Sequence, residues 1–252
     1  MLDHGPTLCV GADPHGEVLN SWNIAHSADG LVEFCEAFVE LLPEDAKVVK
    51  PQVSLFEAFG GNGMVTLETF VQQLRAAGKY VIADAKRSDI GSSMAGYAQA
   101  WLSGEAFDVD AVTVNPYLGV GTLKGFHKQA ESKGKRVFTL IATSNPEAKR
   151  VQAQGLSRQV LEDLIGLHSE ASGVVVGATV DLDEYRLRDL LADSRLPILV
   201  PGFGAQGVSL SSASKLFLGL ESQVIANVSR SVLMGERNKF TQRIESALGE
   251  LS

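Results

Sequence analysis

The chain has 252 residues, 45% of them hydrophobic and 21% charged, and its formal net charge at pH 7 is −8. This is the composition of a globular protein with an ample core, and the length is close to the roughly 250 residues of a (β/α)8 barrel. The negative charge argues against binding to nucleic acid or to an anionic membrane surface. An anionic ligand would therefore need a local cluster of cations.

Eight short apolar segments, rich in β-branched residues, are predicted to be strands. They span residues 8–10, 47–49, 80–82, 111–114, 136–142, 173–176, 197–200 and 223–226. Nearly continuous apolar strands are typical of a parallel sheet that is buried on both faces. Pro51 cannot donate a hydrogen bond to a neighbouring strand, so we expect the second strand to stop at Lys50.

A helical pattern of apolar residues follows each predicted strand. The predicted helices span residues 31–42, 67–77, 92–102, 121–132, 157–169, 183–191, 211–217 and 236–248, and the Gly-Gly-Asn-Gly run at 60–63 is predicted to be a loop. Eight strand–helix units without a linker or a shift in composition predict an α/β protein. Its fold should be a single-domain (β/α)8 TIM barrel that covers residues 1–252.

Charged side chains gather at the end of the third predicted strand, in the sequence Ala-Asp-Ala-Lys-Arg-Ser-Asp-Ile at 83–90. Side chains alternate between the two faces of a strand, so Asp84 and Lys86 should project from the same face. Asp89 follows shortly afterwards. Two acids beside a lysine would keep it charged and fixed, which a proton donor requires. A salt bridge that merely finishes the strand explains the spacing equally well.

The carboxyl ends of barrel strands are where active sites of this fold lie. The polar residues that follow the predicted strands are Asp13, Lys50, Asp84, Lys86, Asn115, Ser144, Thr179, those of the loop 202–207, and those of the turn 227–230. The last two segments suit a phosphate group. Glycines let backbone N–H groups approach an anion, and Arg230 offers a bidentate fork for its oxygens.

Other kinds of site find no support in the sequence. The histidines and the two cysteines lack metal-ligand spacing, so no metal site is predicted, and Cys9 and Cys35 are expected to be buried free thiols. There is no nucleophile elbow, Walker loop or dinucleotide fingerprint. With no signal peptide, polybasic arm or membrane-spanning apolar run, we expect a soluble cytoplasmic protein that binds neither nucleic acid nor membrane.

Together these motifs resemble the orotidine 5′-monophosphate decarboxylase family, and specifically its bacterial branch with longer loops. The resemblance covers nearly the whole chain. It lies in Val-Gly-Ala-Asp-Pro-His at 10–15, Lys-Pro-Gln at 50–52, Asp-Ala-Lys-Arg-Ser-Asp-Ile-Gly at 84–91, Asn-Pro-Tyr at 115–117, Thr-Ser-Asn-Pro at 143–146, Gly-Ala-Thr at 177–179, Pro-Gly at 201–202 and Ser-Arg at 229–230. The Asp-x-Lys-x-x-Asp core is shared by a wider group of phosphate-binding barrels, whereas its combination with Lys-Pro-Gln and Thr-Ser-Asn-Pro is more specific.

The resemblance implies conversion of orotidine 5′-monophosphate to uridine 5′-monophosphate and CO2, in pyrimidine biosynthesis, by a homodimer without metal or organic cofactor. It assigns a charged tetrad to Lys50, Asp84, Lys86 and Asp89, with Asp89 reaching the partner subunit's site and Lys86 protonating C6 of the pyrimidine. The remaining assignments are to substrate binding: Asp13 and Lys50 at the ribose, Ser144 at the pyrimidine, Gln206 and Arg230 at the phosphate, and Ser93 across the dimer.

Two other functions remain compatible with the sequence. One is a sugar-phosphate aldolase or decarboxylase of the same barrel group, in which Asp84 would help to bind magnesium. The other is a barrel that binds a nucleotide without turning it over. Metal dependence would indicate the first, and tight binding of uridine 5′-monophosphate without turnover would indicate the second.

Overall fold

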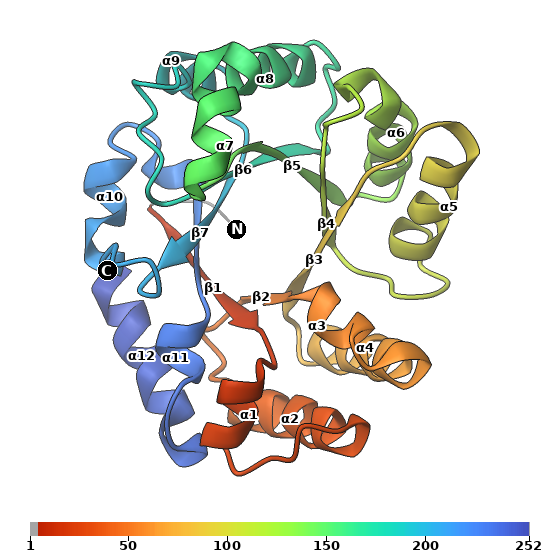
Figure 1. Ribbon diagram of the computed structural model, residues 1–252, viewed down its shortest axis with the longest axis vertical. Helices are drawn as coiled ribbons and strands as arrows, with labels where there is room; N and C mark the ends of the chain where they lie inside the picture. Colours follow the sequence, from red (N-terminus) through yellow and green to blue (C-terminus); the bar gives the residue numbers. More distant parts are fainter. Residues whose placement is uncertain (1–4, 252) are drawn as a thin grey trace.

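Eight parallel strands form a closed barrel in the computed structural model, which describes residues 5–251 (Figure 1). The strands are β1 (Thr7–Ala12), β2 (Val48–Pro51), β3 (Tyr80–Arg87), β4 (Ala111–Val114), β5 (Arg136–Ala142), β6 (Ser172–Val176), β7 (Ile198–Phe203) and β8 (Val224–Val228). Each strand pairs with its neighbours in chain order, and β1 also pairs with β8, which closes the ring. The predicted (β/α)8 fold and all eight strand positions are confirmed.

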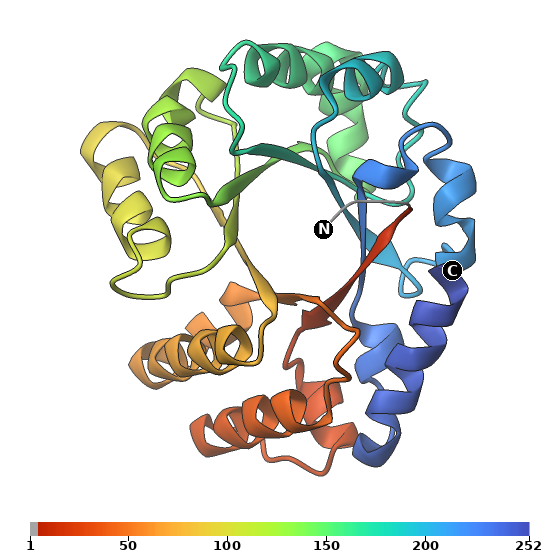
Figure 2. The same ribbon diagram turned by 180° about the vertical axis from the view of Figure 1, so that it is seen from behind.

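Helices surround the barrel on its outside, as the view from behind also shows (Figure 2). The outer helices are α2 (Ala28–Leu41), α4 (Gly60–Ala76), α5 (Gly91–Leu102), α6 (Lys124–Ser132), α8 (Ser157–Ile165), α9 (Arg188–Ser194), α10 (Ala213–Leu216) and α12 (Phe240–Leu251). Short 3-10 or π segments lie at Val120–Leu123, Gln152–Leu156, Leu210–Ser212, Glu221–Gln223 and Arg237–Lys239. Within residues 5–251, no helix is long and apolar enough to cross a membrane.

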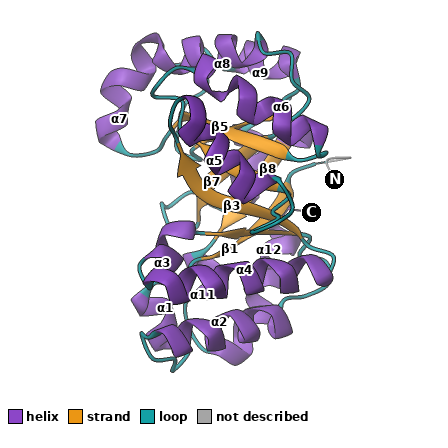
Figure 3. Cartoon of the chain, turned by 90° about the vertical axis from the view of Figure 1, so that its right-hand side faces the viewer, coloured by secondary structure: helices purple, strands orange, loops and turns teal. Residues whose placement is uncertain are grey.

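Four additional short helices follow strands almost directly and were not predicted: α1 (Gly16–Ser21), α3 (Val53–Glu57), α7 (Pro146–Val151) and α11 (Arg230–Leu233). Figure 3 shows α1, α3 and α7 toward the same end of the barrel. Each is only four to six residues long, so its sequence carries too little periodicity to be recognised.

Among the boundaries that differ from prediction, two differ for identifiable reasons. The glycines at 60–63 open helix α4 instead of forming a loop, and Gly63 packs so closely that a Cβ would lie 2.0 Å from the carbonyl oxygen of Phe56. Helix α9 begins at Arg188, not at Asp183, because the Asp181 carboxylate accepts hydrogen bonds from the N–H groups of Asp183 and Glu184 and forms a turn. Strand β2 also runs one residue past its predicted end, through Pro51.

A layer of apolar side chains fills the barrel interior, with one residue from each strand. Its members are Cys9, Val48, Ile82, Ala111, Phe138, Val175, Leu199 and Ile225. A second, larger cluster lies between the strands and the outer helices. Because side chains alternate along a strand, the residues two positions further on must face the interior again, one layer nearer the carboxyl ends of the strands.

Candidate active site

The layer above the apolar core consists largely of polar and small residues. Counting two positions on from each core residue gives Gly11, Lys50, Asp84, Thr113, Leu140, Gly177, Pro201 and Asn227. All but Gly11 line a cavity of about 380 Å³, at the end of the barrel where active sites of this fold lie. Because side chains alternate along each strand, the charged groups of Lys50 and Asp84 lie at the floor of this cavity.

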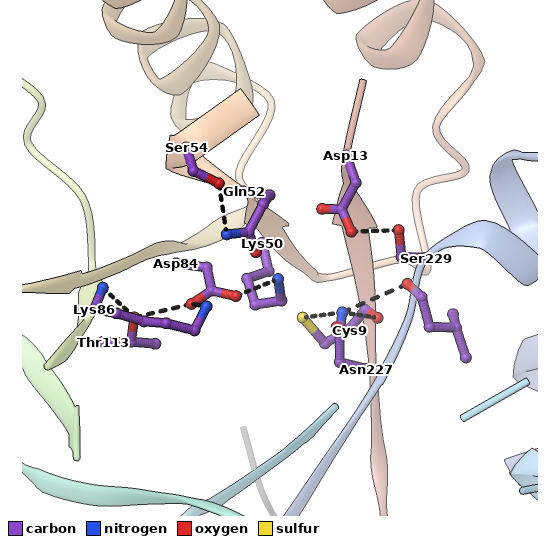
Figure 4. A network of polar contacts seen from close by, with 11 residues as sticks. Cys9, Asp13, Lys50, Gln52, Ser54, Asp84, Lys86, Thr113, Asn227 and Ser229 are labelled. Atoms are coloured by element: carbon purple, nitrogen blue, oxygen red, sulfur yellow. Dashed lines mark hydrogen bonds and ion pairs between the residues drawn. The ribbon is translucent and has the colours of Figure 1, made fainter. Parts of the chain in front are cut away.

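Asp84 is the centre of a charged network on that floor (Figure 4). Its Oδ2 accepts a hydrogen bond from Lys50 Nζ at 2.9 Å, and its Oδ1 accepts one from Lys86 Nζ at 2.5 Å. Oδ1 also accepts a hydrogen bond from Thr113 Oγ1 at 3.0 Å. Lys50 is 3% exposed and Asp84 is 9% exposed, whereas the Lys86 side chain is 45% exposed. The more accessible of the two ammonium groups is thus the one on Lys86.

The two buried partners keep each other charged. Burial alone would raise the pKa of Asp84, but the ammonium groups of Lys50 and Lys86 hold it well below its ordinary value. Burial alone would lower the pKa of Lys50, but the carboxylates of Asp84 and Asp13 raise it above its ordinary value. Both groups are therefore ionised at neutral pH.

Lys86 occupies an unusual backbone conformation, with φ of 48°. This left-handed region is disfavoured for residues with a Cβ, and such residues gather at functional sites. The pairing of β3 with β4 is interrupted between Ala83 and Arg87. The Lys86 ammonium nevertheless meets the Asp84 carboxylate, so the predicted pairing of these two side chains is found.

Asp13 provides a second carboxylate at the edge of the cavity. Its Oδ2 accepts a hydrogen bond from Ser229 Oγ at 2.5 Å, whereas its buried Oδ1 has no hydrogen-bond partner among residues 5–251. A Cβ at Gly11 would lie 2.7 Å from Ser229 Cβ, so only glycine lets β8 bring this serine so close to β1. A buried carboxylate oxygen without a partner is unusual in a folded protein, which makes Asp13 Oδ1 a candidate acceptor for a ligand hydroxyl or amide group.

Ser144, Gln206 and Arg230, which are predicted to bind the substrate, line the same cavity. Gly177 allows the close approach of Ser144, because a Cβ there would lie 2.9 Å from the Ser144 backbone nitrogen. With Lys50, Lys86 and Arg230 counted as cations and Asp13 and Asp84 as anions, the charged residues of the lining sum to a formal charge of +1. This is the local cationic environment that an anionic ligand would need in a chain of charge −8.

Asp89 and Ser93 do not line the cavity. Asp89 Oδ1 accepts a hydrogen bond from its neighbour Ile90 N at 2.7 Å, and Ser93 is exposed on α5. Asn115 and Thr179, which also follow strands, are absent from the lining as well; Asn115 Oδ1 accepts a hydrogen bond from Tyr117 N. These residues lie beyond the layer that strand alternation directs inward.

The cavity also contains polar residues to which the sequence analysis gave no individual role, namely His15, Gln52, Thr113, Thr143, Asn145, Asn227 and Ser229. Thr113 could have been found, because it lies two residues beyond the buried core residue Ala111 of its strand. The same count places Asn227, in the turn 227–230, on the inner face. The contact of Ser229 with Asp13 joins residues 216 positions apart and has no local signal.

A closed barrel with an ionised Asp–Lys network at the carboxyl ends of its strands belongs to the class of (β/α)8-barrel enzymes. Among residues 5–251, no three His, Cys, Asp or Glu side chains are grouped as metal ligands would be. A family model described as "Orotidine 5′-phosphate decarboxylase / HUMPS family" matches residues 6–239. The chain belongs to this family.

Curated relatives and solved structures agree with this assignment. The chain is 42% identical over 241 residues to orotidine 5′-phosphate decarboxylase of Corynebacterium glutamicum strain R, covering 90% of this chain and 85% of that protein. The enzyme of Salinispora arenicola is 41% identical, with 92% and 86% covered. The crystal structure of a putative orotidine 5′-phosphate decarboxylase from Streptomyces avermitilis superposes with a TM-score of 0.84 at 38% identity, over 97% of this chain and 92% of that one. These three relatives are bacterial, as expected.

Proposed function

We propose that the protein, acting as one domain over residues 1–252, decarboxylates orotidine 5′-monophosphate to uridine 5′-monophosphate and CO2. The observation that carries the proposal is the pairing of two ammonium groups, those of Lys50 and Lys86, with one buried carboxylate, that of Asp84. The names of the curated relatives supply the substrate. The proposed pathway is pyrimidine biosynthesis.

The reaction needs a proton donor held at one carbon atom. Breaking the bond between C6 and the carboxylate leaves an electron pair on C6 in the plane of the ring, where the π-system cannot delocalise it. A fixed ammonium at that carbon stabilises the developing charge and then supplies the proton. In our proposal Lys86 has this role, and the resulting neutral amine regains a proton from solvent. No metal or organic cofactor enters these steps.

The other cavity residues hold the substrate in our proposal. Asp13 and Lys50 bind the ribose hydroxyls, and the unpartnered Oδ1 of Asp13 supports this assignment. Ser144 contacts the pyrimidine edge. Gln206 and Arg230 bind the phosphate, which lies far from the reacting carbon and supplies binding energy for alignment. Asp84 lies beside the substrate carboxylate and holds Lys86 in place.

A magnesium-dependent reaction around Asp84 is disfavoured by the contacts of that residue. Both carboxylate oxygens already accept hydrogen bonds, Oδ2 from Lys50 and Oδ1 from Lys86 and Thr113. Two ammonium groups within hydrogen-bonding distance would also repel a divalent cation. The decarboxylation is therefore the better supported of these two functions.

The direct test is to mix the purified protein with orotidine 5′-monophosphate and to follow the pyrimidine absorbance. We expect it to fall as uridine 5′-monophosphate forms, at a rate that a chelator does not change. Turnover only after addition of magnesium, with inertness toward the nucleotide, would instead indicate the sugar-phosphate chemistry. Tight binding of uridine 5′-monophosphate without turnover of the substrate would indicate a binding protein.

We further propose a homodimer in which Asp89 completes the partner subunit's site and Ser93 contacts the substrate there. Two features support this proposal: Asp89 lies outside the cavity of its own chain, and exposed apolar residues lie nearby on the loops after β3 and β4. Those residues are Ile90, Tyr117 and Leu118, with exposures of 59%, 86% and 48%. Exposed apolar side chains that gather on one surface are typical of an interaction surface.

Mixing two inactive variants tests the shared site. If Asp89 acts across the dimer, subunits carrying Lys86→Ala and Asp89→Ala should form hybrids with one intact site, and an equal mixture should regain about a quarter of wild-type activity. The matched control is a mixture of Lys86→Ala with Asp84→Ala. It should regain nothing, because both changes affect the site of their own chain. Failure of the first mixture to exceed the control would exclude the shared Asp89.

A further inference from the structure

Thr113 links Asp84 and Lys86 of β3 through a single hydroxyl group. It lies on β4, is 1% exposed and contributes to the cavity wall. Its Oγ1 donates a hydrogen bond to Asp84 Oδ1 at 3.0 Å and accepts one from the backbone N–H of Lys86 at 2.9 Å. Figure 4 shows the threonine between these partners.

The chemistry of the three groups fixes the direction of both hydrogen bonds. A backbone N–H can only donate and an ionised carboxylate can only accept, so the hydroxyl must accept from Lys86 and donate to Asp84. Asp84 Oδ1 in turn accepts from Lys86 Nζ, which closes a ring from the backbone of Lys86 to its own side chain. A serine can reproduce both hydrogen bonds, whereas a valine can make neither.

The Thr113 hydroxyl makes its hydrogen bonds at an irregularity in the pairing of β3 with β4. Ala83 pairs with Val112 and Arg87 pairs with Val114, so four residue steps of β3 oppose two of β4. Lys86 lies inside this bulge with its left-handed φ of 48°. Bulges redirect side chains beside active sites, and a disfavoured backbone conformation persists only where the surroundings hold it. The Thr113 hydroxyl is one of the contacts that hold it.

We propose that Thr113 is a positioning residue, which fixes the backbone of Lys86 and the carboxylate of Asp84 so that the Lys86 ammonium points at the reacting carbon. The inference rests on the proposed decarboxylation for the identity of that carbon. Thr113 acts through Asp84 and Lys86, so its loss should slow the chemical step more than it weakens nucleotide binding. A misplacement of about 1 Å at such a site costs roughly a hundredfold in rate.

The chain offers a matched control in Thr139 on the adjacent strand β5. Thr139 is fully buried, and its Oγ1 has no hydrogen-bond partner among the residues that the structure describes. It is absent from the cavity lining. Thr139→Val therefore makes the same chemical change in the same barrel without removing a hydrogen bond.

The experiment compares Thr113→Val, Thr113→Ser and Thr139→Val by kcat, by the Kd for uridine 5′-monophosphate, and by amide hydrogen exchange at Lys86. We expect Thr113→Val to lower kcat by about tenfold to a hundredfold while Kd changes less than about threefold. Exchange at Lys86 should accelerate by about tenfold or more, since its N–H loses its acceptor. Thr113→Ser should restore both properties to near wild type, and Thr139→Val should leave both unchanged.

The possible results separate this inference from the function on which it rests. Equal kcat and equal Lys86 exchange in Thr113→Val and Thr139→Val would overturn the positioning role, even if the wild type decarboxylates the nucleotide. Failure of Thr113→Ser to restore kcat would also overturn it. A third result is also possible: the wild type is inert toward orotidine 5′-monophosphate, and amide exchange at Lys86 is faster only in Thr113→Val. That result would support the structural role of Thr113 and overturn the proposed function.

Discussion

Replacing Lys86 by alanine should lower the rate of decarboxylation by about 10²-fold to 10⁴-fold, because the reaction then lacks its positioned proton donor. The fold should survive, since the Lys86 side chain is 45% exposed and Asp84 keeps Lys50 as its counter-ion after the change. The measurement is kcat for orotidine 5′-monophosphate, together with the Kd for uridine 5′-monophosphate and a circular-dichroism melt. The Kd should change far less than kcat.

The control for this prediction is Lys128→Ala, which removes a solvent-exposed lysine from helix α6 and should leave all three measurements unchanged. Decarboxylation by Lys86→Ala at the wild-type rate would refute the proposed mechanism. If the variant instead failed to fold, the view of Lys86 as a chemical group with little structural role would be wrong.

Replacing Asp84 by alanine should damage both stability and activity. Lys50 would keep its buried position without its closest counter-ion, and breaking a buried pair in this way costs about 3–5 kcal/mol in the free energy of unfolding. Activity should fall by at least about a hundredfold, because the Lys86 ammonium loses the carboxylate that positions it. Denaturant unfolding and kcat measure the two effects.

Two further variants show whether the stability loss comes from the unpaired charge. Asp183→Ala removes the exposed ion pair with Arg188 at 2.9 Å and should cost no more than about 1 kcal/mol. The double variant Asp84→Ala/Lys50→Met removes both buried charges, and it should recover much of the stability but none of the activity. If Asp84→Ala lost no more stability than Asp183→Ala, this would contradict the assignment of Lys50 and Asp84 as a strong buried pair.

The stability loss predicted for Asp84→Ala should depend on pH, and the pKa shifts of Asp84 and Lys50 fix the direction of that dependence. The pKa of Asp84 is lowered in the folded state, so its contribution is present above its ordinary pKa of 3.8 and is lost as the pH falls through the lower folded value. The pKa of Lys50 is raised, so its contribution is present below its ordinary pKa of 10.5 and is lost as the pH rises through the higher folded value. The stability difference between wild type and Asp84→Ala should therefore be largest between these limits and shrink in strong acid and strong alkali.

Much of the fold and of the candidate site is encoded locally, and so the sequence alone determined it. Eight apolar segments of the right length specify eight buried strands, because a strand is recognisable from a few consecutive residues. Alternation along each strand then places Lys50 and Asp84 on the face of the core residues Val48 and Ile82. The same argument would have found Thr113 above Ala111.

Other features depended on contacts between distant segments, and only the tertiary structure decided them. The short helices after the strands and the start of α9 depend on turns and packing rather than on periodicity. The hydrogen bond of Ser229 to Asp13 requires strands β1 and β8 to meet when the barrel closes. The bulge that turns Lys86 left-handed arises where β3 and β4 pair unequally. The amino-acid sequence shows which side chains a strand buries. The hydrogen-bond partner of each charged group is determined only when eight separate strands close into one barrel.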